Sequence, residues 1–165
     1  MGGLNQAIIH IWHTNLEVHA HEYELFKNWL SSEEKIRAEK LAPHYRLGFI
    51  IARAVLRDLL AYYSEQYPQN LQFAYSDSGK PSLLNSKQRI EFNLSHSKNI
   101  LAYIFTIDTP VGIDIEYINH RIHLDKIAYR FLPAYEYDRL QLLQGIKKLE
   151  GFFNAWVRNE ALIKA

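Results

Sequence analysis

The sequence predicts an α+β protein, because stretches typical of β-strands and stretches of helical periodicity occur in both halves of the chain. Runs rich in β-branched and aromatic residues lie at 90–94, 100–107 and 111–116. Helical periodicity extends over residues 44–67 and returns from residue 123 onward. With 165 residues, of which 48% are hydrophobic, the chain has enough apolar side chains for a sizeable core.

Residues 7–75 are expected to form two strands and three helices. Residues 7–12 read as a strand and residues 19–30 as a helix. A second, short helix opens at Ser31, which is followed by Ser, Glu and Glu, the residues of a capping box. Pro43 ends that helix and precedes the long helix of residues 44–67. A short strand at 71–75 then leads into a turn-rich loop.

The C-terminal part is expected to be mainly helical. Pro133 marks the start of a helix, and Gly151 lies before or within the last one. Only the run at 111–116 offers a strand to cover these helices, and that is too little sheet for them. We therefore expect the apolar side of the last helix to need a partner surface; it comprises Phe152, Phe153, Trp156, Leu162 and Ile163.

Composition and charge exclude several classes of protein. The net charge is +1, so bulk electrostatics give no argument for nucleic-acid binding. The absence of cysteine excludes a disulfide framework and a thiolate metal site, and fits a cytoplasmic protein. The longest apolar runs, at 49–52 and 100–105, are too short to span a bilayer. The N-terminus lacks the basic and apolar regions of a signal peptide.

Two acidic motifs are the most informative feature of the chain. Asp114 and Glu116 alternate in the expected strand, so both carboxylates point to one face. Glu160 and Lys164 are four residues apart in the last helix and share a helix face with apolar neighbours. A carboxylate on such a stripe is costly unless a cation or a hydrogen bond meets it. Three converging carboxylates would suit Mg²⁺, bound together with substrate phosphates.

Each of these patterns also has an ordinary explanation. A Glu and a Lys four apart are usually a surface pair on a helix. Acidic residues that alternate on a strand are usually its solvated face. The combination with features that suit phosphate binding favours the functional interpretation.

Several basic and polar residues are candidates for phosphate contacts. Six basic residues and one acid lie between residues 35 and 57, among them Arg37 and Arg53. Lys80 lies in a tight Gly-Lys-Pro turn, which can present an ammonium group beside exposed backbone N–H groups. Ser95 and His96 lie at the end of an expected strand, where they could be directed at a ligand.

Four motifs occur in order along residues 79–164: Gly79-Lys80-Pro81, Phe92-Asn-Leu-Ser-His-Ser97, Gly112-Ile-Asp-Ile-Glu116 and Trp156-x-x-x-Glu160-x-x-x-Lys164. Together they resemble the 4′-phosphopantetheinyl transferase superfamily, in its larger, pseudo-dimeric type. The resemblance implies two similar α+β lobes in a pseudo-two-fold arrangement. Residues 1–107 would form the first lobe, and residues 108–165 an incomplete second lobe.

The resemblance also implies an activity, which is transfer of 4′-phosphopantetheine from coenzyme A to a serine of an acyl or peptidyl carrier protein (holo-acyl-carrier-protein synthase activity). Asp114, Glu116 and Glu160 would hold Mg²⁺, Glu160 would be the base, and Lys164 would steady charge on the phosphate. The implied contacts to the coenzyme come from Arg37, Arg53, Lys80, Ser95 and His96. Phe131 and Glu136 match the region that meets the carrier protein.

Two departures from the family pattern stand out. Asn159 occupies the position before the helix glutamate where the family commonly has Lys. The chain also stops one residue after Lys164, where the family continues with further strands. We therefore expect self-association or a longer parent protein. The alternatives left open are a non-catalytic module that binds coenzyme A or a carrier protein, and a generic Mg²⁺-dependent phosphohydrolase.

Overall fold

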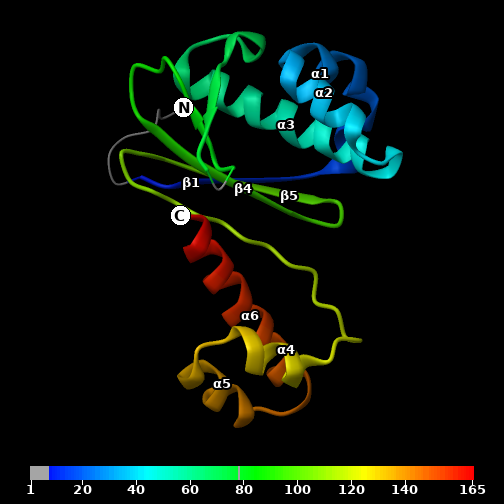
Figure 1. Ribbon diagram of the computed structural model, residues 1–165, viewed down its shortest axis with the longest axis vertical. Helices are drawn as coiled ribbons and strands as arrows, with labels where there is room; N and C mark the ends of the chain where they lie inside the picture. Colours follow the sequence, from blue (N-terminus) through cyan, green and yellow to red (C-terminus); the bar gives the residue numbers. More distant parts are fainter. Residues whose placement is uncertain (1–7, 78) are drawn as a thin grey trace.

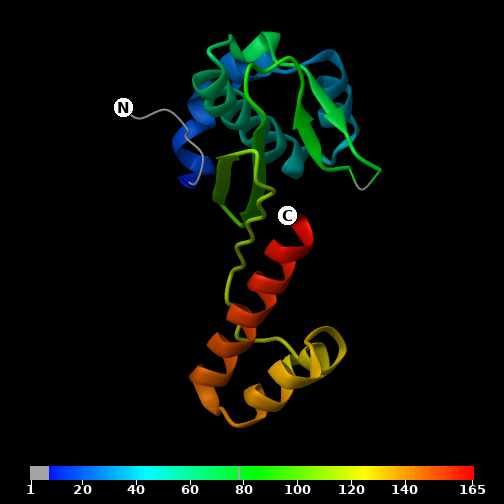
Figure 2. The ribbon, with the colours of Figure 1, turned by 90° about the vertical axis from the view of Figure 1, so that its left-hand side faces the viewer.

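The computed structural model describes residues 8–77 and 79–165, and it has two parts (Figure 1). The first part is a small sheet covered by helices on one face. The second part is a group of three helices, joined to the first by a long extended segment. The last helix runs back toward the uncovered face of the sheet, so that the C-terminus lies close to the strands (Figures 1 and 2). The α+β class expected from the sequence is confirmed.

The sheet contains β1 (His10–Asn15), β4 (Ile90–Ser97) and β5 (Ile100–Ile107) in the order β1-β5-β4, and all its pairings are antiparallel. β5 is central and almost wholly buried. The expected strand at 100–107 is confirmed, whereas β1 begins later than the expected 7–12, and residue 7 lies outside the described residues.

One face of this sheet is covered by helices. They are η1 (Leu16–Glu22, a 3₁₀ helix), α1 (Tyr23–Trp29), α2 (Ser32–Lys40) and α3 (Pro43–Ser64). The capping box is confirmed, because Ser31 Oγ accepts a hydrogen bond from the N–H of Glu34, whose carboxylate accepts one from the N–H of Ser31. Pro43 opens α3 at a position where its missing N–H costs nothing.

The main core lies between α3 and the sheet. Ile51 and Leu56 of α3 are fully buried, and they belong to the same cluster as Phe92, Tyr103 and Phe105 of the strands. These three strand residues follow the alternation of β-structure, so they define the face of the sheet that α3 covers. The opposite face carries Asn93, Ser95 and Ser97 of β4.

A small hairpin lies beside this core. After η2 (Pro68–Asn70), β2 (Phe73–Tyr75) pairs with β3 (Pro81–Leu83) in antiparallel fashion. β3 was not expected, because three residues starting with a proline give too short a pattern. Gly79 has a φ of 80°, which favours glycine at this turn.

The second part consists of α4 (Leu124–Phe131), α5 (Ala134–Gln141) and α6 (Gly145–Lys164). Ala128, Leu140 and Phe152 form the centre of its small core. Phe152 and Trp156 are therefore covered by α4 and α5, contrary to the expectation that they lack a partner. Leu162 and Ile163 are 76% and 79% exposed, as expected. None of the helices in the described residues is long and apolar enough to cross a membrane.

Candidate active site

An extended segment, residues 111–117, runs beside β4, but it is not the strand that its sequence predicts. Its alternate backbone N–H groups are bound by side-chain oxygens instead of backbone carbonyls. Asn93 Oδ1 accepts from the N–H of Ile113 (3.3 Å), and Ser95 Oγ accepts from that of Ile115 (3.3 Å). Ser97 Oγ accepts from the N–H of Tyr117 (2.9 Å). The segment therefore lies over the uncovered face of β4, where these side chains point.

Gly112 brings this segment against the end of α6. A Cβ atom at this position would lie 1.9 Å from the carbonyl oxygen of Ala161 and 2.7 Å from the backbone nitrogen of Ala165. No side chain fits in that space, so the close approach of segment and helix requires glycine. The contact places the last turn of α6 directly beside Asp114.

Asp114, Lys164 and Ser95 meet at this junction. Lys164 Nζ lies 2.5 Å from Asp114 Oδ1 and 3.3 Å from Ser95 Oγ, and Ser95 Oγ donates to Asp114 Oδ1 at 2.8 Å. The side chain of Asp114 is only 5% exposed. Its second oxygen, Oδ2, is buried and has no hydrogen-bond partner among the described residues. One edge of a buried carboxylate is thus left for a further cation or donor.

The other two carboxylates do not join Asp114. Glu116 is exposed and accepts a hydrogen bond from Ser97 Oγ at 3.4 Å, while Glu160 is partly exposed one turn before Lys164. In residues 8–77 and 79–165, no three His, Asp or Glu side chains are grouped closely enough to hold a metal ion. The expected convergence of three carboxylates is therefore not seen among these residues, and the charged partner of Asp114 is Lys164.

Lys80 lies at the same junction. Its Nζ donates to the carbonyl oxygen of Val111 at 3.4 Å and to a backbone oxygen of Ala165 at 2.6 Å. Asn93 Nδ2 also reaches the carbonyl of Lys164 at 3.4 Å. The hairpin, β4, the extended segment and α6 thus meet at one place.

Arg37 and Arg53 lie on the helix side of the sheet. Their guanidinium groups lie 5.6 Å and 5.9 Å from the ring centroid of Phe49. Arg37 is exposed, whereas Arg53 is 9% exposed and lies 3.4 Å from the carboxylate of Glu34. The structure therefore brings the two arginines together, away from Asp114, with only Arg37 open to solvent.

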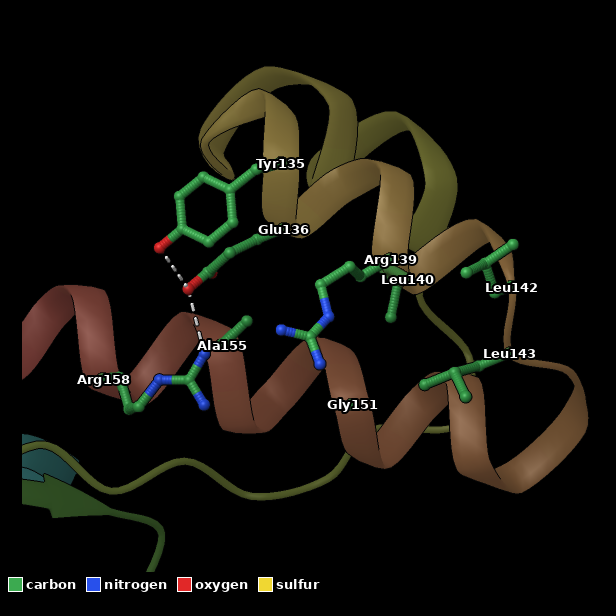
Figure 3. A pocket seen from close by; sticks show the side chains of 9 residues that line it. All are labelled: Tyr135, Glu136, Arg139, Leu140, Leu142, Leu143, Gly151, Ala155 and Arg158. Carbon is green, nitrogen blue, oxygen red and sulfur yellow. Dashed lines mark hydrogen bonds and ion pairs between the residues drawn. The ribbon is translucent and has the colours of Figure 1, made fainter.

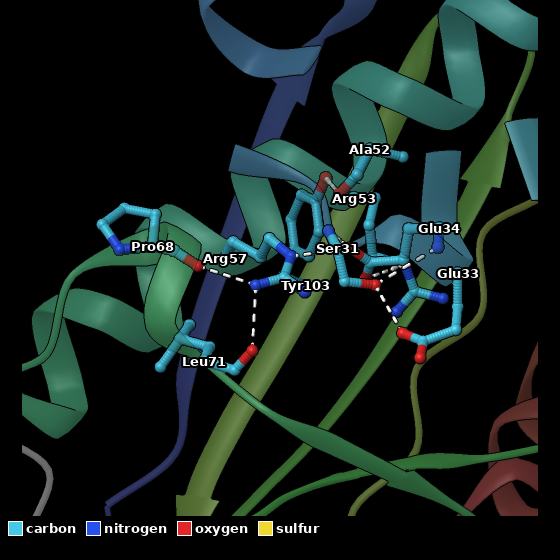
Figure 4. Close-up of polar contacts among 9 residues, drawn as sticks. All are labelled: Ser31, Glu33, Glu34, Ala52, Arg53, Arg57, Pro68, Leu71 and Tyr103. Carbon is cyan, nitrogen blue, oxygen red and sulfur yellow. Dashed lines mark hydrogen bonds and ion pairs between the residues drawn. The ribbon is translucent and has the colours of Figure 1, made fainter. Parts of the chain in front are cut away.

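Glu34 is the centre of a buried ionic cluster, shown in Figure 4. Arg57 Nε donates to Glu34 Oε2 at 2.8 Å, and Arg57 Nη1 donates to the carbonyls of Pro68 and Leu71. Nearby, the Tyr103 hydroxyl donates to the carbonyl of Ala52, and burial raises the pKa of this phenol well above its usual range. The cluster fixes α2 and η2 against α3.

His96 lies on the other side of β4 from Ser95. Successive side chains of a strand point to opposite faces, so His96 shares the face of Phe92 and Leu94. It is exposed at the end of the strand, where it pairs with Leu101 of β5. The structure does not bring His96 to the Asp114 junction.

A hollow of about 650 Å³ separates α5 from α6 (Figure 3). At its rim Glu136 Oε1 accepts hydrogen bonds from Arg158 (2.9 Å) and from the Tyr135 hydroxyl (3.1 Å). Asn159 Nδ2 donates to the other oxygen of Glu136 at 3.3 Å. Asn159, the departure from the family pattern, therefore helps to join α5 to α6. Phe131 is more than half exposed and packs edge-on against Trp156.

The sequence analysis assigned no role to three residues that build the junction, namely Asn93, Ser97 and Gly112. Polar side chains at every second position of β4 were a visible signal for the first two. Gly112 gave no such signal, because its role depends on how closely α6 approaches the extended segment.

Comparisons to known proteins identify the family of this chain. A family described as "4′-phosphopantetheinyl transferase superfamily" matches residues 110–165, which hold Gly112, Asp114 and Lys164. A 4′-phosphopantetheinyl transferase of Nostoc, HetI, is 32% identical over 160 residues, which cover 95% of this chain and 68% of the relative. The chain therefore belongs to the 4′-phosphopantetheinyl transferase superfamily.

Two further relatives are similar over smaller shares. A putative 4′-phosphopantetheinyl transferase of Synechocystis is 36% identical over 138 residues, 82% of this chain but only 56% of the relative. The crystal structure of a Bacillus anthracis holo-(acyl-carrier-protein) synthase in complex with CoA (3′,5′-ADP) superposes with a TM-score of 0.51 at 19% identity. The superposition covers 60% of this chain and 93% of the synthase. At this low identity the similarity concerns the fold alone.

Proposed function

We propose that the protein transfers 4′-phosphopantetheine from coenzyme A to a serine of an acyl or peptidyl carrier protein. The observation that carries this proposal is the junction of Asp114, Lys164 and Ser95, of which Asp114 and Lys164 lie within the family match. A buried carboxylate with one free oxygen, next to a lysine, can organise a pyrophosphate and the charge that develops on it.

The proposed roles follow the resemblance of the motifs, and Arg53 and His96 lie away from the Asp114 junction. The serine hydroxyl of the carrier attacks phosphorus, its proton passes to Glu160, and the bond to adenosine 3′,5′-bisphosphate breaks. Lys164 and Lys80 donate to the phosphate oxygens from the two sides of the junction. Arg37, exposed over Phe49, binds the terminal 3′-phosphate. Arg53, Ser95 and His96 remain the other proposed contacts to the coenzyme.

The residues present fit a magnesium ion. The free Oδ2 of Asp114 is a hard oxygen ligand, and Mg²⁺ is usually held by only one or two carboxylates together with substrate phosphates. Asp114, with Glu116 and Glu160 as further ligands, would hold it. When bound, the ion neutralises charge on the pyrophosphate.

The test is the mass of a carrier protein incubated with coenzyme A and Mg²⁺. We expect a mass gain of one phosphopantetheine group, and near-complete loss of it with Asp114→Ala or Glu160→Ala. Glu150→Ala, at an exposed glutamate of the same helix, is the matched control and should transfer normally. Turnover close to wild type in either site variant would show that the junction is not catalytic.

Arg37→Ala tests the binding of the coenzyme separately. The variant should bind coenzyme A about tenfold or more weakly, because a guanidinium bonded to phosphate is lost. It should bind the 3′-dephospho form as the wild type does. Equal losses for both ligands would reject this assignment.

A second candidate function is a module that binds coenzyme A or a carrier protein without catalysis. The observation in its favour is that Glu116 and Glu160 lie apart from Asp114, so that no three carboxylates are grouped in the described part of the chain. The chain spans 68% and 56% of the lengths of the two curated relatives. Calorimetric binding of coenzyme A without any mass change of the carrier would support it.

Self-association also stays a prediction. Large apolar side chains are exposed on both parts of the molecule, namely Ile11 of β1 and Leu162 and Ile163 of α6. Light scattering tests whether the chain associates.

A further inference from the structure

A second hollow, of about 720 Å³, lies between β1 and α3, on the helix side of the sheet. It is separate from the Asp114 junction, which lies on the opposite face. Its walls include the aromatic rings of Trp12 of β1 and of Tyr62 and Tyr63 of α3, beside Leu59, Ala61 and Pro68. Trp12 and Tyr62 are 45% and 49% exposed, so their rings are accessible from solvent.

The polar groups of two of these rings, Trp12 and Tyr63, are already engaged. The hydroxyl of Tyr63 accepts a hydrogen bond from Trp12 Nε1 at 2.7 Å and bonds His10 Nδ1 at 2.8 Å. The rings of Tyr62 and Tyr63 are 5.2 Å apart at an interplanar angle of 68°. What remains for a ligand is the faces of fixed rings, and these carry partial negative charge.

A carboxylate without a partner completes the lining. Asp58 lies one helical turn before Tyr62, on the same side of α3. Its side chain has no hydrogen bond or ion pair with any described residue, and the described lining holds no Lys or Arg. Burial raises the pKa of Asp58, and Glu22 raises it further against a smaller opposing effect of His19. The surroundings of Asp58 are thus short of positive charge.

We propose that this hollow binds an alkylated ammonium group, held by the faces of the aromatic rings and by the Asp58 carboxylate. Aromatic rings attract such cations electrostatically, and quaternary ammonium ligands are commonly bound in aromatic cages. A neutral apolar ligand of equal size would leave Asp58 desolvated and without a counter-charge. The ammonium group can belong to a small molecule or to a methylated lysine of a partner protein. This binding does not depend on the transferase activity.

The test follows the NMR resonance of the Trp12 indole N–H while the complete chain is titrated with choline. A parallel titration uses the tert-butyl analogue of choline, an uncharged alcohol of the same shape. We expect choline to shift the resonance with saturation, and the neutral analogue to bind at least about tenfold more weakly. A capped trimethyllysine serves as a third ligand, and its affinity relative to choline separates the two sources.

Asp58→Asn should reduce the affinity for choline about tenfold, and Tyr62→Leu should reduce it as well while leaving the carboxylate in place. Asp138→Asn, at an exposed aspartate of α5, should change nothing. Because Asp58 has no partner to lose, its variant should keep the fold, which the dispersion of the remaining resonances checks. Equal binding of choline and its neutral analogue, or full affinity in both site variants, would overturn the proposal.

Discussion

The two parts of the molecule differ in how they are held together. The sheet and its helices enclose sixteen buried apolar residues in one cluster, with a buried ionic group at one side. The three-helix part encloses five, of which two are alanines. The first part should be stable without the second, because its own core buries far more apolar area.

The candidate site lies where the more stable part, the sheet with its helices, meets the less stable three-helix part. Asp114 is fixed to β4 by Ser95, but Lys164 and Glu160 are carried by α6, whose remaining contacts are to α4 and α5. The geometry of the junction therefore depends on the less stable part. A rigid sheet and a more mobile α6 would allow a substrate to enter the site without unfolding of the sheet.

The sharpest test of this difference is Phe152→Ala. Removing a 2% exposed phenylalanine from the small core should cost about 3–5 kcal/mol, enough to unfold the three helices on their own. Hydrogen exchange should then show lost protection in α4–α6 and retained protection in α3 and β5. Phe92→Ala, at a similarly buried position of β4, should instead destabilise the first part. Leu142→Ala, at an exposed position, is the control. Uniform loss of protection with Phe152→Ala would mean that the two parts unfold together.

Gly112→Ala tests the contact between the two parts. The added Cβ cannot fit beside the carbonyl of Ala161, so segment and helix must separate by about 1 Å, and such a displacement costs roughly 100-fold in turnover. Carrier modification measures this, while circular dichroism should show both parts folded. Gly48→Ala in α3, where the new Cβ meets only Leu16 at 3.7 Å, should keep full activity. Normal turnover of the Gly112 variant would show that the close approach is unimportant.

A smaller effect is expected from Ser31→Ala, which removes the cap of α2. The loss should be about 1 kcal/mol of stability in the first part, seen as a lower denaturant midpoint. Ser32→Ala, at the next and exposed position, should have little effect. The three-helix part should be unaffected by either change, and a shift in its own transition would contradict the separation of the two parts.

The smallest effect concerns Asp125, which joins α4 to Lys148 of α6 at 2.7 Å and to Gln141 of α5. The hydrogen bond from Lys148, and then that from Gln141, lowers the pKa of Asp125 below its ordinary 3.8. The stabilisation that Asp125 gives to the folded state is therefore present above pH 3.8. It is lost as the pH falls through the lower pKa of Asp125 in the folded protein. Asp125→Asn should make the melting temperature of the helical part slightly lower at neutral pH and less sensitive to acid. If the melting temperatures of the variant and the wild type depend on pH in the same way, Asp125 does not stabilise the helical part.

Much of the fold was predictable from local patterns. The period-two run at 100–107 and the cap at Ser31 act over a few residues, and both expectations are confirmed. The run at 111–116 was predicted as a strand because its sequence is β-rich, but side-chain oxygens from β4 replace the backbone partners there. Periodicity carries no information on which atoms meet a backbone N–H group.

The candidate site was predictable in part. The sequence indicated that Asp114 and Lys164 belong to one site, and the structure brings them into contact. It could not show that Glu116 and Glu160 lie apart from Asp114, or that Arg53 is buried beside Glu34 while Arg37 is not. These outcomes depend on the packing of helices far apart in the sequence, which residue spacing does not encode.

The side-chain hydrogen bonds of segment 111–117 have a consequence for its alignment. A strand displaced by one residue turns its other set of N–H groups toward its neighbour, and here that set would find no side-chain oxygens of β4. Asn93, Ser95 and Ser97 therefore determine which N–H groups of the segment face β4. Because the same Ser95 hydroxyl also donates to Asp114, the carboxylate of Asp114 keeps its place along β4.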